Sequence, residues 1–304
     1  MFDLVGKRHW FFALSGVIII VGLVFLGIFR LKWGVDFSPG SELTVRFSQA
    51  VDRGALVAEM ADLGYPDAAV QGVGENSYII RTTSNVTGEE LARIKDRIEE
   101  KLSPFAAQPT LASVGPAHSR QIVRGAAIAV AVGALGILLY IAWAFRRLPR
   151  PFRYGTCAIV GLLHDILVVV VVFSILGKLL NMEVDLMFVT GVLAVIGYSV
   201  NNTVVVFDRI RENLGRGIGA NFADTVNLSL VQTLGRSLNT SLTTVFVLLA
   251  LYLVVGIEIR PFILVLLVGV IAGTYSSLFI ASQLLVVWER GEVGRLWLRL
   301  RPKR

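Results

Sequence analysis

The residues most able to do chemistry are polar side chains inside long apolar stretches. Asp165, beside His164, is the only carboxylate deep in such a stretch. If that helix begins near Tyr154, Asp165 lies about 16 Å along it, close to the middle of a bilayer. Ionisable groups at this depth often mark proton or ion pathways. We therefore expect Asp165 and His164 to handle protons or ions; the alternative is a buried acid satisfied by a neighbouring helix.

Two further sets of polar residues lie in apolar segments. Asn201 and Asn202 are adjacent amides within the stretch GYSVNNTVVVFDRIREN, and Arg236 and Thr240 open a hydroxyl-rich stretch. Arg236 can extend to the membrane interface or turn inward to pair with an acid or amide. The hydroxyls can bond their own helix or join helices. Together with Asp165, these four residues are our candidates for a proton or ion pathway.

Enzymatic readings fit the sequence poorly. Gly197 and Ser199 begin a G-x-S-x-G pattern, but Asn201 occupies the position of the closing glycine. No H-E-x-x-H, P-loop or dinucleotide motif occurs. An intramembrane aspartyl protease needs two facing carboxylates, and only Asp165 is deep. We expect no catalytic activity, no metal and no bound cofactor.

The composition is that of a membrane protein. Of its 304 residues, 55% are hydrophobic and 17% are charged, and the mean hydropathy is +0.69. The chain is therefore much more apolar than a typical soluble domain. About 20 apolar residues cross a bilayer. The six predicted spans are roughly Trp10–Phe29, Ile122–Phe145, Tyr154–Gly177, Val184–Phe207, Ser237–Gly256 and Pro261–Trp288. The single cysteine, Cys157, falls in the third span, where we expect it to pack.

The net charge of +7 is a signal of topology. Residues 31–121 hold 9 Lys/Arg and 12 Asp/Glu, whereas the remainder holds 20 and 10, with the excess at one set of helix ends. By the positive-inside rule, both termini are predicted to be cytoplasmic and 31–121 to be translocated. The predicted organisation is 1–30 with an uncleaved first span, an extracytoplasmic domain at 31–121, five helices at 122–288 and a basic cytoplasmic tail at 289–304. Nucleic-acid binding is not expected.

The translocated domain has a readable α+β pattern. Its predicted elements are a strand Leu43–Phe47, a helix from Asp52 to Leu63, strands Ala69–Val73 and Tyr78–Arg81, a helix from Thr87 to Leu102 and a strand Thr110–Val114. Thr87 and Glu90 have the spacing of a capping box. The order βαββαβ predicts a ferredoxin-like sandwich. Without a catalytic constellation, this domain is expected to be structural or to dock a partner.

Small residues at four-residue spacing predict close helix packing. One stripe comprises Gly125, Ala129 and Gly133, and another comprises Gly269, Gly273, Ser277 and Ala281. Small side chains let helix backbones approach in lipid. These stripes indicate a packed bundle and nothing more specific.

Several ordered motifs resemble those of one family over almost the full chain. They are Gly34-Val35-Asp36-Phe37, Val114-Gly115-Pro116, His164-Asp165, Val184-Asp185-Leu186, Ile196-Gly197-Tyr198-Ser199, the run from Val204 to Asn213, and the run from Leu230 to Arg236. With these motifs the chain resembles the SecD/SecF protein-export membrane proteins, SecF-type members of the resistance–nodulation–division superfamily.

The resemblance implies a six-helix half-transporter in the bacterial cytoplasmic membrane. Such a subunit pairs with SecD and uses the proton-motive force to help draw the preprotein across the lipid bilayer after SecA and SecYEG begin translocation. The resemblance also implies that the position of Asn202 is usually Asp and that this Asp and Arg236 belong to the proton path. Asn cannot titrate near physiological pH. Three explanations stay open: a titrating acid elsewhere, another coupling ion, or an introduced substitution.

Two other functions also stay open. One is a standalone half-transporter for lipids or small hydrophobic molecules, although six spans give half of the usual twelve-helix unit. The other is a scaffold that stabilises the translocon without conducting ions. This function stays open because Asn202 is neutral.

Overall fold

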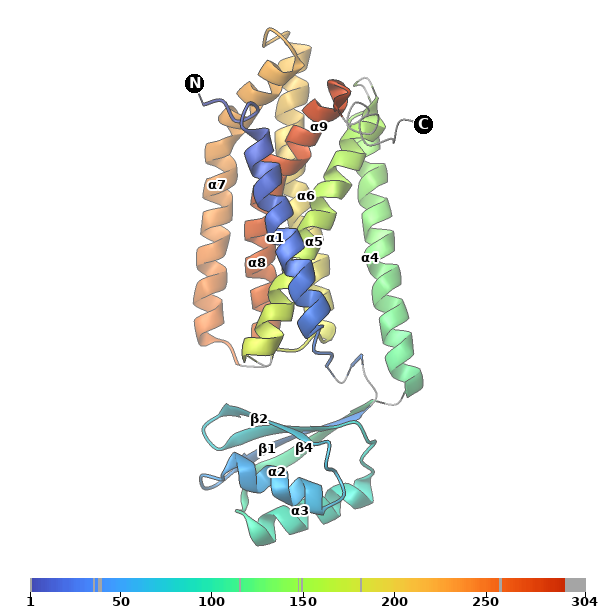
Figure 1. Ribbon diagram of the computed structural model, residues 1–304, viewed down its shortest axis with the longest axis vertical. Helices are drawn as coiled ribbons and strands as arrows, with labels where there is room; N and C mark the ends of the chain where they lie inside the picture. Colours follow the sequence, from blue (N-terminus) through green and yellow to red (C-terminus); the bar gives the residue numbers. More distant parts are fainter. Residues whose placement is uncertain are drawn as a thin grey trace, which may run out of the picture. The chain divides into compact units, whose positions relative to one another are not determined.

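The fold consists of membrane-length helices and a small α+β domain. A computed structural model describes residues 2–34, 36–37, 40–114, 116–146, 148, 150–180, 182–256 and 259–292 (Figure 1). The predicted tail at 289–304 therefore lies largely outside the described residues. The chain divides into a helical unit and a second unit formed by residues within 31–127 together with 179–186.

Six apolar stretches of helix are long enough to cross a membrane, which confirms the predicted spans. The helices are α1 (Arg8–Phe29), α4 (Pro116–Ala144), α5 (Pro151–Leu180), α6 (Leu186–Gly215), α7 (Phe222–Val254), α8 (Arg260–Ser276) and α9 (Ser282–Glu289). A π-helical turn, η1 (Ser277–Ala281), joins α8 to α9 within the last stretch.

Helix α7 is much longer than the apolar span predicted from Ser237. It begins at Phe222, where the side chain of Asn221 accepts a hydrogen bond from the amide of Asp224. At 33 residues, α7 is about 50 Å long and exceeds the hydrocarbon thickness of about 30 Å. The first turns of α7 were not predicted from hydropathy because only about half of their residues are apolar. Arg236 consequently lies mid-helix.

The two stripes of small residues have different surroundings. A Cβ added at Gly269 would lie 2.1 Å from Val195 Cγ2 of α6, and one at Gly273 would lie 2.9 Å from Ser199 Cβ. Ser277 is fully buried. Apart from the adjoining backbone of α4 itself, no described atom lies within 4 Å of a Cβ added at Gly125 or Gly133, and Ala129 is exposed. Only the α8 stripe therefore brings two helix backbones into close approach within the described chain.

The second unit has the predicted βαββαβ order. Its elements are β1 (Gly40–Phe47), α2 (Arg53–Asp62), β2 (Ala69–Gly74), β3 (Ser77–Thr82), α3 (Gly88–Lys101) and β4 (Phe105–Val114). The antiparallel sheet has the strand order β2-β3-β1-β4, and the two helices cover one of its faces (Figure 1). This is the predicted ferredoxin-like sandwich.

Local signals for this unit were accurate at the helix starts. Asp52 accepts a hydrogen bond from the amide of Ala55, and Thr87 and Glu90 form both bonds of the capping box. Strand β4 begins at Phe105, five residues before the predicted start. Pro109 lies within this longer strand, and β4 is an edge strand, where a missing N–H is tolerated.

Candidate functional site

The side chain of Asp165 is the centre of a hydrogen-bonded cluster inside the helical unit. It is 0% exposed on α5. Two hydroxyls donate to Oδ2, Ser199 of α6 at 2.5 Å and Ser276 of α8 at 2.9 Å. Its other oxygen, Oδ1, lies 3.0 Å from Nδ1 of His164. An ionised carboxylate accepts all three bonds, so the cluster supplies the partners that a buried acid requires.

His164 extends the cluster to α1. Its Nε2 lies 2.5 Å from Oγ of Ser15, and its ring stacks on Tyr275 with centroids 6.0 Å apart. When Nδ1–H of a neutral ring donates to Asp165, Nε2 accepts from Ser15. When the ring is charged, both nitrogens donate and the Ser15 hydroxyl turns to accept. Ser15, His164 and Asp165 thus form a path along which a proton can be relayed.

The π-helical turn lies beside this cluster. Ser276 precedes it and donates to Asp165, while Ser277 opens it and lies 2.8 Å from the hydroxyl of Thr203. Ser277 also donates to the carbonyl of Ser199 at 3.3 Å. π-Helical turns are rare and frequent at functional sites. Two consecutive serines of one helix therefore reach two neighbouring helices.

Asn202 is buried but lies outside the hydrogen-bonded cluster. It is 5% exposed, and its Nδ2 has no hydrogen-bond partner among the described residues; the same holds for the buried Ser237 hydroxyl of α7. Bonds of Asn213 with Ser229 and of Tyr198 with Ser241 fix the antiparallel register of α6 and α7. That register puts Asn202 and Ser237 at the same level.

The other predicted pathway residues are separate from Asp165. Asn201, Arg236 and Thr240 are all exposed. Arg236 lines a cavity of about 380 Å³ with Asp208, Glu212 and other residues of α6 and α7. The structure thus joins Asp165 and His164, buries Asn202 nearby on α6, and leaves the remaining three on the surface of the unit.

Sequence reasoning missed three partners of the central pair. Ser15, Ser199 and Ser276 contact His164 or Asp165, yet serines in apolar helices usually bond their own backbone. The only available signal was the small-residue stripe of α8, which includes Ser277 and indicates close approach. Among the described residues no group of His, Cys, Asp and Glu could hold a metal ion.

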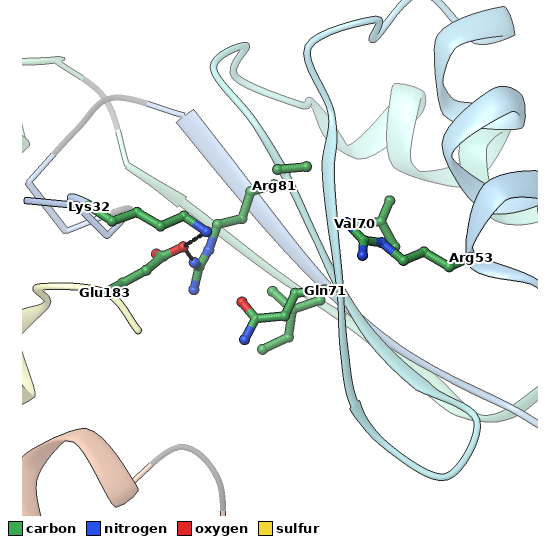
Figure 2. Close-up of a pocket in the computed structure, with 8 residues that line it drawn as sticks. Lys32, Arg53, Val70, Gln71, Arg81 and Glu183 are labelled. Carbon is green, nitrogen blue, oxygen red and sulfur yellow. Dashed lines mark ion pairs between the residues drawn. The ribbon is translucent and has the colours of Figure 1, made fainter. Parts of the chain in front are cut away.

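A second polar cluster lies in the α+β unit, where Glu183 contacts Lys32 and Arg81 (Figure 2). The Nζ of Lys32 is 3.2 Å from Oε1 of Glu183, and Nε of Arg81 is 2.6 Å from Oε2 of Glu42. Burial and the positive charges of Arg81 and Arg53 lower the pKa of Lys32 from its ordinary value. Because Val184 also forms a β-bridge with Trp33, we assign this cluster a structural role.

Comparison with known proteins identifies the relatives of this chain. The model of the C-terminal region of protein export membrane protein SecD/SecF matches residues 94–291, and that of the SecD/SecF GG motif matches residues 24–51. The chain is 45% identical to protein translocase subunit SecF of Thermobaculum terrenum over 100% of this chain and 99% of that protein. It is 34% identical to SecDF of Bacillus subtilis over 96% of this chain and 39% of that protein.

A solved structure shows the same architecture. The crystal structure of SecDF from Thermus thermophilus, described as a translocon-associated membrane protein, superposes with a TM-score of 0.83 at 29% identity. The match covers 95% of this chain and 39% of that chain. The chain thus spans nearly the whole of one relative and well under half of the SecDF proteins.

Proposed function

The chain belongs to the SecD/SecF family of protein-export membrane proteins, and we propose that it is the SecF-type subunit of a Sec translocase accessory complex. It is a multi-pass membrane protein that promotes protein export across the bacterial cytoplasmic membrane. The similarity to a translocase subunit over both full lengths supports this function. We further propose cytoplasmic termini, because the basic residues gather at one set of helix ends; reporter fusions to each loop test this topology.

A second membrane subunit, SecD, is the partner that the surface of α7 favours. Asn201, Arg236, Asn239, Thr240 and Thr243 are exposed on neighbouring helices of the unit. Polar groups exposed to lipid are costly and usually face protein or water. Covering this face with a second half-transporter removes the cost, and this favours a paired subunit over a standalone transporter.

Cysteine crosslinking tests the pairing. A cysteine at Thr240 is expected to crosslink to SecD in membranes that contain both proteins. Leu238, which is 49% exposed, points away from Thr240 on the same helix because two residues turn a helix by about 200°. Crosslinking that is equally efficient from Leu238→Cys would contradict the assigned face.

The proton-motive force is the proposed energy source, with Asp165 as the titrating acid of this chain. Asn202 lacks a titratable group, whereas the Asp165 carboxylate is buried and joined to His164 and Ser15 by a continuous path. Protonation of Asp165 removes its charge, and the hydroxyls of Ser199 and Ser276 then lose an ionic acceptor. Charged-group hydrogen bonds contribute about 1.5–3 kcal/mol each, so this event alters the contact of α5 with α6 and α8.

Export into vesicles that contain the chain and SecD tests this proposal. Asp165→Asn is expected to abolish the stimulation of export by a proton gradient and to leave export without a gradient unchanged. Ser276→Ala should reduce the stimulation in part. Ser282→Ala is the matched control, because Ser282 is equally buried but donates to the carbonyl of Leu278 in its own helix. Full stimulation in the Asp165→Asn variant would refute the assignment.

A non-conducting scaffold is the second candidate function, and the uncharged amide of Asn202 is the observation that favours it. A scaffold predicts that loss of the whole chain lowers export whereas Asp165→Asn changes nothing. The same vesicle assay therefore separates the two functions.

A further inference from the structure

A cavity of about 290 Å³ lies where α5 begins and α9 ends. Its polar lining consists of Arg150, Arg153 and Glu289. Its apolar lining includes Tyr154 and Leu285, which are 4% and 3% exposed and belong to the core of the helical unit. The cavity therefore joins a cationic rim to an apolar floor.

The rim already holds one anionic oxygen. Nη1 of Arg153 lies 2.6 Å from Oε2 of Glu289, and Nη1 of Arg150 lies 3.9 Å from the same atom. Two guanidinium groups against one carboxylate leave the rim with a net charge of +1. The side chain of Glu289 is 48% exposed, so a competing anion can displace it toward solvent without leaving a buried carboxylate unpaired. An external anion in the place of this oxygen would lie within 4 Å of both guanidinium groups.

Aromatic residues place this rim at the level of the membrane interface. Arg153 lies 5.7 Å from the ring centroid of Trp288, and Arg146 lies 4.8 Å from that of Trp143. Both tryptophans are exposed on helices of membrane length. Tryptophan is enriched at the boundary between hydrocarbon and headgroups. An anionic lipid that approaches from this level can place its headgroup at the arginines and its acyl chain against the apolar lining.

We propose that this cavity binds the phosphate of an anionic phospholipid, with Arg150 and Arg153 on the phosphate. Leu214 and Phe222 line the same cavity and provide apolar contact for the glycerol and the first carbons of the acyl chain. Basic pockets between membrane helices are suited to anionic headgroups. The site does not depend on the proposed export function, because its occupancy is a property of the isolated chain.

Lipid binding to the purified full-length chain tests the site by native mass spectrometry. Phosphatidylglycerol is expected to bind more tightly than phosphatidylcholine. Each of Arg150→Gln and Arg153→Gln should weaken phosphatidylglycerol binding about fivefold, from the usual contribution of one basic residue near an anionic surface. Glu289→Gln should strengthen binding about fivefold, because it removes the competing acid. This gain of affinity keeps the test decisive if an arginine variant folds poorly.

Arg216→Gln is the matched control. Arg216 directly follows the last residue of α6 and does not line the cavity. Its side chain is 62% exposed and pairs with Glu212. A loss of affinity equal to that of Arg153→Gln would show a diffuse charge effect and overturn the proposal. Weaker binding in Glu289→Gln would also overturn it. A further outcome is that inorganic phosphate protects the chain from thermal unfolding as well as phosphatidylglycerol does. That result would overturn the assignment of a lipid and identify the ligand as a free anion.

Discussion

Replacing Gly269 with alanine is expected to separate α6 from α8. The added Cβ would lie 2.1, 2.5 and 2.8 Å from Cγ2, Cγ1 and Cβ of Val195. Val195 is 1% exposed, and a β-branched side chain in a helix has one strongly preferred rotamer. The clash therefore cannot be relieved by rotating the end of a flexible side chain.

The magnitude follows from these distances. Carbon atoms pack at about 3.5 Å, so the helices must move apart locally by roughly 1.4 Å. Overpacking of a well-packed core costs about 1–3 kcal/mol, and we expect Gly269→Ala to lower the free energy of unfolding by this amount. Because Ser276 follows on the same helix, its 2.9 Å bond to Asp165 should lengthen as well, and gradient-stimulated export should fall.

Chemical denaturation in detergent measures the effect, with Gly133→Ala as the control. Apart from the adjoining backbone of its own helix, no described atom lies within 4 Å of a Cβ at Gly133, and alanine favours a helix over glycine by about 1 kcal/mol. The control should therefore be neutral or slightly stabilised. Adding Val195→Ala to Gly269→Ala should restore part of the stability, since it removes the two closest carbons but leaves Cβ. Equal stabilities of Gly269→Ala and Gly133→Ala would refute the reasoning.

Three further predictions concern individual polar groups. Asn202→Asp places a titratable acid at a buried position, so the pH profile of gradient-driven export should gain a titration step; an unchanged profile would contradict a coupling role for this position. Burial raises the pKa of Glu59, but hydrogen bonds and charges from Lys101 and Arg97 outweigh burial and leave the pKa below its ordinary value of 4.5. The α+β unit should therefore lose stability as the pH falls below about 4.5, and Glu59→Gln should make its stability less dependent on pH. Hydrogen exchange, corrected for intrinsic rates, measures this stability. The same acid sensitivity in both proteins would argue against a contribution from Glu59. Thr87→Ala removes the cap of α3 and should cost about 1 kcal/mol in the unfolding of that unit; exchange protection of α3 that is unchanged would show that the cap contributes little.

Much of the fold was predictable because its signals are local. Hydropathy located six spans because one helix must cross the apolar layer by itself, and its own residues carry that requirement. The capping box at Thr87 and the cap at Asp52 were read correctly for the same reason. The length of β4 was not predictable, since Pro109 is acceptable only at an edge and strand order is a property of the whole sheet.

The candidate site, like the fold, combines features that local sequence determines with contacts that only the tertiary structure sets. Sequence alone determined that Asp165 lies deep in a membrane-length helix beside His164, and that Asn202 cannot titrate. Only the tertiary structure decided that Ser15, Ser199 and Ser276 reach this pair, and that Arg236 and Thr240 lie on an exposed face instead. The periodicity of a helix defines its faces but does not specify which neighbour each face meets. That choice depends on how closely the backbones approach, and here Gly273 against Ser199 permits the approach that brings α8 to the carboxylate.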